Sequence, residues 1–180
     1  MKKLITSLKN YYRILRYFVG SQKYRVVYSR RMGVKIGEGC SLLGGLFPFS
    51  SEPYLVSLGN NVRVTAGVRF VTHDGGMHVL RNLHQRKFDK FGCIEIGSNV
   101  FIGINSIILP GTKIGSNVVI GAGSICTGRL EENSVYAGVP AKRICSTDHY
   151  YQKNICEIID TEHVNDTIER RRLIEKKVSG

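Results

Sequence analysis

The stretch IEIGSNVFIGINSIILPGTKIGSNVVIGAGSICTGRLEENSVYAGV, residues 94–139, repeats with a period of six. One apolar side chain marks each repeat: Ile96, Ile102, Ile108, Ile114, Ile120 and Cys126. Glycine follows four of these, and a small or β-branched residue stands four places after the first five: Gly97, Gly103, Gly115 and Gly121, then Val100, Ser106, Thr112, Val118 and Ser124. Apolar positions on one helical face recur at three and four, and a strand alternates with period two. The period of six therefore predicts short extended runs joined by regular corners, whose inward side chains form a core when the turns stack.

This hexad pattern resembles that of the hexapeptide-repeat acyltransferases, in which three hexads make one turn of a left-handed parallel β-helix. The resemblance implies an all-β solenoid, and the handedness and three-sided cross-section come from the resemblance alone. The alternative is a β-sandwich strand pair with glycine turns, whose strand lengths would not repeat in phase.

The rest of the chain divides around this solenoid. Residues 1–32 are predicted as a basic N-terminal helical arm, residues 33–144 as the β-helix, and residues 145–180 as a C-terminal helical cap that hides the edge of the last turn. The hexad phase breaks over residues 43–57 and 74–92, which are predicted as excursion loops. Long loops on a rigid scaffold often carry function.

Composition narrows the partners and the compartment. The net charge of +12 favours phosphate groups, an acidic polymer or a membrane surface. Because no helix-turn-helix, zinc knuckle or aromatic RNA-binding motif accompanies that charge, we expect no nucleic-acid partner. Five cysteines without a C-x-x-C pair indicate a reduced, cytoplasmic protein. Basic residues interrupt the apolar N-terminal positions, so neither a signal peptide nor a membrane-spanning helix is expected.

The N-terminal arm carries an apolar stripe at helical spacing among basic residues, and no acidic residue precedes Glu38. The stripe comprises Leu4, Leu8, Tyr11, Leu15 and either Phe18 or Val19. Such a stripe usually packs on protein, here the β-helix or a neighbouring subunit. Its basic face also suits peripheral association with an anionic membrane at the inner leaflet.

Residues 34–144 resemble the acetyl-CoA-dependent sugar and polysaccharide O-acetyltransferases. The resemblance rests on Thr72-His73, on the hexads from Ile96 to Ser124, and on the segment AGVPAK at 137–142. It implies that His73 is the general base, since an imidazole titrates near operating pH. A carboxylate is needed to fix the tautomer of such a base, and Glu52 is the first candidate, with Asp74 the second.

The resemblance also implies where coenzyme A binds, in a groove between adjacent subunits. The matching positions are Gly103, Ile104, Ala122, Thr127, Arg129, Lys142 and Arg143. The cationic members would meet the phosphates of the cofactor. Two positions depart from the family pattern: Ile104 replaces a small polar residue, and Gly128 stands where a lysine is common. In the basic loop after His73, the substrate candidates are His78 and Arg81.

The sequence therefore favours an acetyl-CoA-dependent O-acetyltransferase, assembled as a homotrimer, that acts on a sugar or glycan and needs no metal. An N-acetyltransferase of a nucleotide-linked amino sugar is the main alternative. A further alternative is a zinc carbonic anhydrase, because His73, His78 and His84 are clustered in the sequence. Two of these histidines, however, lie where the repeat is broken. A non-catalytic assembly subunit built on a β-helix is the third alternative.

Overall fold

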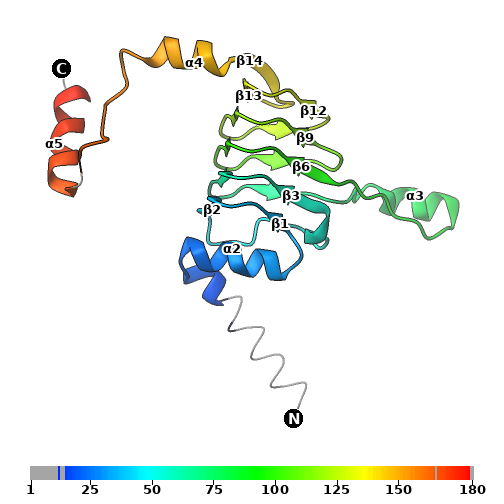
Figure 1. Cartoon of the computed structure of the whole chain (residues 1–180). Coiled ribbons are helices and arrows are strands. Elements are labelled where there is room, and N and C mark those ends of the chain that lie inside the picture. Colours follow the sequence, from blue (N-terminus) through cyan, green and yellow to red (C-terminus); the bar gives the residue numbers. More distant parts are fainter. Residues whose placement is uncertain (1–11, 13–14, 165, 179–180) are drawn as a thin grey trace. The chain divides into compact units, whose positions relative to one another are not determined.

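The computed structural model describes the chain except residues 1–11, 13–14, 165 and 179–180 (Figure 1). It divides into two compact units, Met1–Thr147 and Asp148–Gly180, and each is described here by itself. The larger unit contains every strand in the described part of the chain.

Short strands assemble into three sheets, and all but one of the pairings are parallel. Sheet A comprises β1 (Lys35–Ile36), β3 (Val56–Leu58), β6 (Ile94–Ile96), β9 (Lys113–Ile114) and β12 (Arg129–Leu130). Sheet B comprises β2 (Ser41–Leu42), β4 (Arg63–Val64), β7 (Val100–Ile102), β10 (Val118–Ile120), β13 (Ser134–Ala137) and β14 (Lys142–Ser146). Sheet C comprises β5 (Arg69–Phe70), β8 (Ile107–Ile108) and β11 (Ile125–Cys126).

The chain visits sheets A, B and C in rotation, so that each round forms one coil on top of the last (Figure 1). Register partners in the regular part lie three hexads apart, as Ile96 and Ile114 do in sheet A and Ile107 and Ile125 do in sheet C. Three hexads therefore make one coil, as the resemblance to the hexapeptide-repeat family implies.

The predicted inward positions form the core. The five in-phase isoleucines and Cys126 are at most 5% exposed. The small and β-branched positions between them, from Val100 to Ser124, are at most 1% exposed. Burying an isoleucine stabilises the fold by about 1.5–3 kcal/mol, so the repeat supplies most of its own stability. Burial also raises the pKa of the Cys126 thiol to about 12, which makes it an inert apolar side chain.

The corners between sheets need glycine where the coils touch and asparagine where the backbone turns left-handed. A Cβ atom on Gly103 would lie 2.6 Å from the backbone nitrogen of Ala122 on the next coil. Asn99, Asn117 and Asn133 all have positive φ, and their side-chain amides form a ladder with bonds of 2.9 and 2.8 Å. Asparagine tolerates this conformation better than most residues.

The segment 43–57 was expected to be a loop outside the repeat, but it contributes to the first coil. Phe49 is 4% exposed, forms a bridge to Phe70 and stacks on its ring at 5.0 Å. The 3₁₀-helix η1 (Pro53–Leu55) then leads directly into β3. Phe49 stands seven positions after Leu42 instead of six, which hid it from the period.

The segment 74–92 leaves the stack and returns beside its starting point, as Figure 1 shows. It contains helix α3 (Met77–His84), which was not expected in a loop. Backbone bonds close its base, from Asp74 N to Lys90 O and from Gly92 N to Thr72 O, both 2.9 Å. The helix exposes the apolar side chains of Val79, Leu80 and Leu83.

Helix α2 (Gln22–Arg31) packs on the first coil, capped at its start by the Ser21 hydroxyl and tied by Arg25 to the carbonyls of Leu42 and Leu43. Just before it, Tyr17 is buried at 3% exposure. Three members of the predicted apolar stripe are exposed: Leu15, Phe18 and Val19. The other three, Leu4, Leu8 and Tyr11, lie outside the described residues. No described part of the stripe is therefore buried against the β domain.

The C-terminal part begins with a strand instead of a helix. β14 runs antiparallel to β13 and includes Cys145 and Ser146, which were assigned to the helical cap. Antiparallel pairing lets a short segment cover the last strand of sheet B. Helices α4 (Thr147–Asn154) and α5 (Thr167–Val178) follow, and the described residues between them are not helical. None of the helices in the described residues is both long and apolar enough to cross a membrane.

Candidate active site

His73 lies at the corner where the second coil passes from sheet C to sheet A, three residues after the end of β5. Its side chain is 42% exposed, and its backbone forms an antiparallel bridge with Phe91 at the end of the excursion. The two rings meet edge to face with centroids 6.3 Å apart. The imidazole therefore sits at the rim of the coil, where the base of the 74–92 segment supports it.

Glu52 from the preceding coil contacts this imidazole. Its Oε2 lies 3.1 Å from His73 Nδ1, and its side chain is only 17% exposed. Asp74, the other candidate partner, instead accepts a hydrogen bond from the Gly76 backbone nitrogen and lies 3.6 Å from the Lys90 ammonium. The structure thus brings together His73 and Glu52, from corners one coil apart.

Two hydroxyl groups complete this corner, and sequence reasoning did not single out either as functional. Thr72 is fully buried, and its Oγ1 donates to Glu52 Oε2 at 2.8 Å. Ser50 Oγ lies 2.6 Å from Thr72 Oγ1 and accepts from the Thr72 backbone nitrogen at 3.1 Å. Thr72 could have been suspected because it precedes His73, whereas Ser50 lies in a phase-broken stretch without any pattern.

These contacts determine the charge on Glu52. Partial burial tends to raise the pKa of its carboxyl, but hydrogen bonds from Thr72, His73 and Ser51 and the charge on a protonated His73 outweigh burial and hold the pKa below its usual range. The carboxylate is therefore ionised near neutral pH, so it accepts the hydrogen from Nδ1 and leaves Nε2 of a neutral ring as the basic nitrogen.

The two predicted substrate residues, His78 and Arg81, both lie on α3. Arg81 is bonded within the excursion, because its guanidinium donates a hydrogen bond to the Phe88 carbonyl and forms an ion pair with Asp89. His78 Nε2 lies 3.5 Å from the Asn82 amide on the same helix. Arg81 thus shapes the excursion, and its guanidinium has partners there already.

The zinc alternative required several ligands to converge. Among the residues that the structure describes, no group of three or more His, Cys, Asp or Glu side chains is arranged to hold a metal ion. His73 instead takes the carboxylate partner described above, and His78 contacts an amide.

The structure does not gather the predicted coenzyme A residues in one place on a single chain. Gly103, Ile104 and Ala122 lie at corners between sheets B and C, where Gly123 N donates to Ile104 O at 2.7 Å and binds the two coils together. Ile104 is 52% exposed. His73, by contrast, lies at the opposite edge of that sheet, so a single chain does not bring these positions to the imidazole.

The remaining predicted positions are also dispersed. Thr127 lies at the same kind of corner as His73, two coils further along. Arg129 is in sheet A, paired with Glu131 at 3.0 Å. Lys142 and Arg143 lie on β14, where Arg143 Nε donates to Ser134 Oγ at 2.9 Å. Lys142 is exposed.

Comparison with known proteins decides the family. The pattern described as "Bacterial transferase hexapeptide (six repeats)" matches residues 94–128. Protein CapG of Staphylococcus aureus is 45% identical over 148 residues, which cover 82% of this chain and 86% of CapG. This chain belongs to the hexapeptide-repeat acyltransferases. As a member of that family, it is an acyltransferase.

Other members of the family match over shorter stretches. The galactoside O-acetyltransferase of Escherichia coli is 41% identical over 109 residues, 57% of this chain and 52% of that enzyme. Among solved structures, a galactoside acetyltransferase in complex with coenzyme A aligns with a TM-score of 0.52 at 24% identity, covering 81% of this chain and 82% of that one. The hexapeptide-repeat acetyltransferase VCA0836 of Vibrio cholerae aligns with a TM-score of 0.55 at 17% identity, covering 74% and 86%. At these identities the structural likeness concerns the fold.

Proposed function

We propose that this protein transfers an acetyl group from acetyl-CoA to a hydroxyl of a sugar or surface polysaccharide, with His73 as the general base. The observation that carries the proposal is the 3.1 Å contact between Glu52 and the His73 ring at the rim of the coil. We also assign the coil to the left-handed parallel β-helix class, on the grounds of the three-sheet rotation and the family.

In the proposed reaction, His73 Nε2 removes the proton from the acceptor hydroxyl as its oxygen bonds to the thioester carbonyl carbon. The carbonyl π electrons move to the oxygen, where a backbone N–H stabilises the oxyanion. The oxyanion then re-forms the carbonyl and the C–S bond breaks. The imidazolium gives its proton to the departing thiolate, so that the products are the acetyl ester and free coenzyme A. Glu52 stabilises the imidazolium between these two steps.

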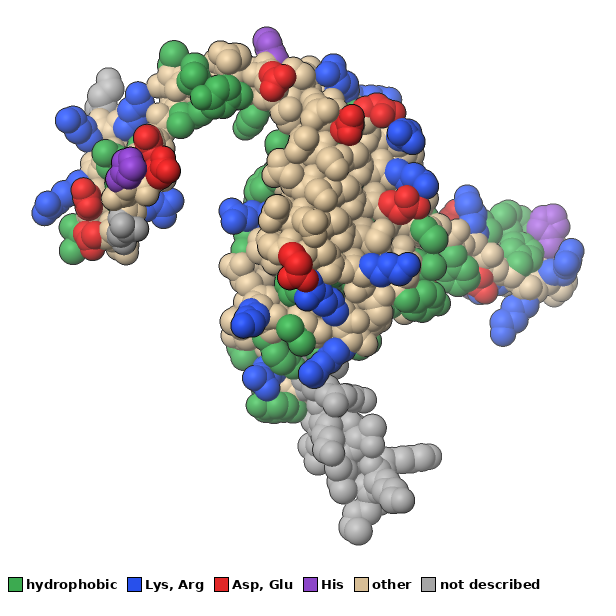
Figure 2. All heavy atoms as spheres, viewed as in Figure 1, with side chains coloured by type: hydrophobic (Ala, Val, Ile, Leu, Met, Phe, Trp, Pro, Cys, Tyr) green, Lys and Arg blue, Asp and Glu red, His purple; other side chains and the backbone are tan. Residues whose placement is uncertain are grey.

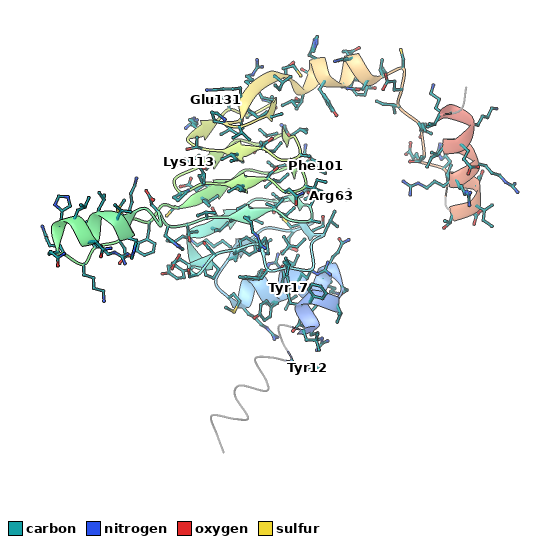
Figure 3. The ribbon with its side chains drawn as sticks, turned by 180° about the vertical axis from the view of Figure 1, so that it is seen from behind. Tyr12, Tyr17, Arg63, Phe101, Lys113 and Glu131 are labelled. Carbon is teal, nitrogen blue, oxygen red and sulfur yellow. The ribbon has the colours of Figure 1, made fainter. Side chains whose placement is uncertain are left out.

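The outward faces of sheets A and B differ in polarity, and this difference supports a homotrimer. Sheet A is polar outside, with Glu95 and Lys113 paired at 2.9 Å, whereas Phe101 in sheet B is 40% exposed. Figure 3 shows Phe101 on one side of the stack and Lys113 on the other, and Figure 2 shows the acidic and basic side chains interspersed over sheet A. Closed symmetry would cover the apolar faces. It would also bring the Gly103 edge of one subunit to the His73 edge of the next.

The acceptor is proposed from charge and from relatives. The excursion carries Arg81, Arg86, Lys87 and Lys90 against Asp74 and Asp89, which suits an extended, often acidic glycan. CapG, the galactoside O-acetyltransferase and a putative lipopolysaccharide O-acetyltransferase of Escherichia coli are similar chains, the last at 50% identity over 57 residues. Lys142, Arg143 and Arg129 are proposed to meet the cofactor phosphates.

The enzyme is proposed to be cytoplasmic, and its N-terminal arm is proposed to bind the inner face of the membrane. Leu15, Phe18 and Val19 are exposed, and Lys23, Arg30 and Arg31 follow within α2 and its last turn. This combination of apolar and basic side chains suits an anionic lipid surface.

The decisive experiment offers purified protein acetyl-CoA with a panel of acceptors and measures release of free coenzyme A. Oligosaccharides or glycans should become O-acetylated. UDP-linked 4-amino sugars are the competing acceptors, because a basic excursion also suits a nucleotide diphosphate. Efficient N-acetylation of those sugars without turnover of any glycan would replace our proposal by the N-acetyltransferase alternative. The absence of any thermal shift with acetyl-CoA would favour a non-catalytic subunit.

The trimer has its own test. Light scattering at micromolar protein should give three times the chain mass of 20.1 kDa. A monomeric mass would refute both the trimer and the coenzyme A site shared between subunits.

A further inference from the structure

The hydroxyl groups of Thr72 and Ser50 form a hydrogen-bond chain whose direction is determined throughout. A hydroxyl has one hydrogen. Thr72 uses its hydrogen toward Glu52 Oε2 at 2.8 Å, so Ser50 must supply the hydrogen in the 2.6 Å contact with Thr72 Oγ1. Ser50 Oγ in turn accepts from the Thr72 backbone N–H. No member of the chain can reverse without breaking another bond.

The backbone that carries these hydroxyls is held by the coils. Ser50 N donates to Phe70 O at 3.1 Å, and Val71 N donates to Ile108 O at 2.9 Å. Thr72 is fully buried, and its carbonyl accepts from Gly92 at the base of the excursion. The hydroxyls therefore belong to the rigid stack, although the carboxylate that Thr72 contacts lies in the segment leading to η1.

Glu52 depends on this support more than an ordinary partner would. Its residue precedes η1 at the N-cap position, but its side chain makes no capping bond and reaches the corner instead. The same oxygen, Oε2, accepts from Thr72 and faces His73 Nδ1. A glutamate has three side-chain torsions, so without the Thr72 hydroxyl only the histidine itself and Ser51 would hold the carboxylate in place.

We propose that Thr72 and Ser50 are positioning residues, which hold Glu52 against His73 Nδ1 and thereby fix the ring tautomer that presents Nε2 to the acceptor. Neither hydroxyl is assigned a contact with substrate. The expected effect on turnover rests on the proposed acetyl transfer, whereas the expected effect on the tautomer of the histidine ring does not.

The kinetic test compares Thr72→Val, which keeps the shape of the side chain but removes the hydroxyl, with Thr72→Ser, which keeps the hydroxyl. We expect Thr72→Val to lower kcat by about 10- to 100-fold, by analogy with the loss when a group that orients a metal-bound histidine is removed. KM for acetyl-CoA should not change, and Thr72→Ser should retain most of the turnover. Ser50→Ala should lower kcat less, because Ser50 contacts only Thr72, whose hydroxyl can still donate to Glu52 Oε2.

Thr112→Val is the matched control. Thr112 lies at the equivalent corner of the next coil, is equally buried, and donates its hydroxyl to the carbonyls of Leu109 and Cys126. Its replacement also removes a buried hydroxyl and its hydrogen bonds, so it should cost a similar amount of thermal stability, although both carbonyls keep backbone donors. It should leave kcat unchanged, since none of those acceptors touches the imidazole.

The second readout is the histidine ring itself. In protein with ¹⁵N-labelled histidine, two-bond ¹H–¹⁵N spectra distinguish the two neutral tautomers. The signals of His73 are recognised by their loss in His73→Asn. We expect the Nδ1–H tautomer in wild type and Thr72→Ser, and a mixture of tautomers in Thr72→Val.

These results separate two kinds of failure. If wild type transfers no acetyl group to any acceptor, the proposed function is wrong, and the ring spectra still decide whether Thr72 positions Glu52. If wild type is active but Thr72→Val keeps its turnover or its single tautomer, the positioning role is refuted. Equal loss of turnover in Thr112→Val would also refute it. Should Thr72→Val fail to fold, Ser50→Ala tests the same chain: an unchanged kcat and tautomer there would overturn the proposal.

Discussion

The regular coils over residues 94–137 and the corner formed by residues 50–55 and 71–74 are built on the same three-sheet rotation, but they use it differently. In the regular coils, every sixth side chain enters the core, and Ile102, Ile108 and Ile120 are fully buried. At the corner, the period is interrupted on both coils, and polar side chains meet: Ser50, Glu52, Thr72 and His73.

The difference shows how one scaffold serves two purposes. Strict repetition maximises apolar burial, and the corners that it leaves consist mostly of glycine, serine and asparagine. Where the repeat is broken, extra residues bring in a carboxylate and let an imidazole reach the rim. Backbone bonds from the regular coils, such as Val71 N to Ile108 O, then hold the irregular corner in place.

The largest expected effect concerns the imidazole. His73→Ala should lower turnover by roughly two to four orders of magnitude, the usual contribution of a general base. Its melting temperature should stay near that of wild type, because the side chain is 42% exposed. Assays of coenzyme A release together with thermal melting test both statements. His78→Ala is the control, and near-normal turnover of His73→Ala would assign the base elsewhere.

The second largest effect concerns the regular coils. Ile108→Ala removes a fully buried side chain from the middle of the stack and should lower the free energy of unfolding by about 2–5 kcal/mol. Chemical denaturation measures it. Ile104 is 52% exposed, so Ile104→Ala should lower the free energy of unfolding far less. Equal costs for the two would mean that the stack is not the core of the protein.

Glu52→Gln should lower kcat by about 10- to 100-fold, the range typical of groups that orient a histidine. Its effect on stability depends on pH. The pKa of Glu52 is lower in the folded protein than in the unfolded chain, where it is about 4.3. The ionised carboxylate therefore stabilises the protein at a pH above the unfolded pKa, and this stabilisation is lost as the pH falls through the folded pKa. The melting temperatures of wild type and Glu52→Gln should therefore converge in acid. Divergence toward low pH would contradict the ionised pair.

The smallest effect concerns the asparagine ladder. Asn117→Ala loses two amide hydrogen bonds and places alanine, which tolerates a left-handed backbone less well than asparagine, at φ +57°. The free energy of unfolding should therefore fall by about 1–2 kcal/mol. Asn117→Gly loses the same bonds but suits the left-handed backbone. Comparing the two by chemical denaturation separates the ladder from the backbone preference. If both variants match wild type, the ladder contributes nothing measurable.

Much of the fold could be predicted because the period of six is local information. The in-phase isoleucines, the glycine corners and the buried Cys126 all follow from it. Phe49 could not be found in this way, because one additional residue separates it from the preceding inward position. The strand β14 was likewise missed, since an antiparallel return has no hexad pattern.

The candidate site was predicted only in part. His73 followed from resemblance, and Glu52 was chosen over Asp74 without any spacing rule; the observed contact is with Glu52. Ser50 was not anticipated, and Arg81 turns out to pair with Asp89 within its own segment. The contacts of Ser50 and Glu52 join residues about 20 positions apart through the stacking of coils, which no short sequence window contains.

The sequence alone determined the repeat, the inward residues and the family, because each is encoded by side-chain type at regular spacing. Tertiary structure decided which side chains share the corner at His73. One coil places Glu52 and Ser50 beside Thr72 and His73 of the next, although 20 to 22 positions separate the bonded residues in the sequence. Hydrogen bonds depend on distance and direction in space, and stacking sets these only after the whole coil has formed.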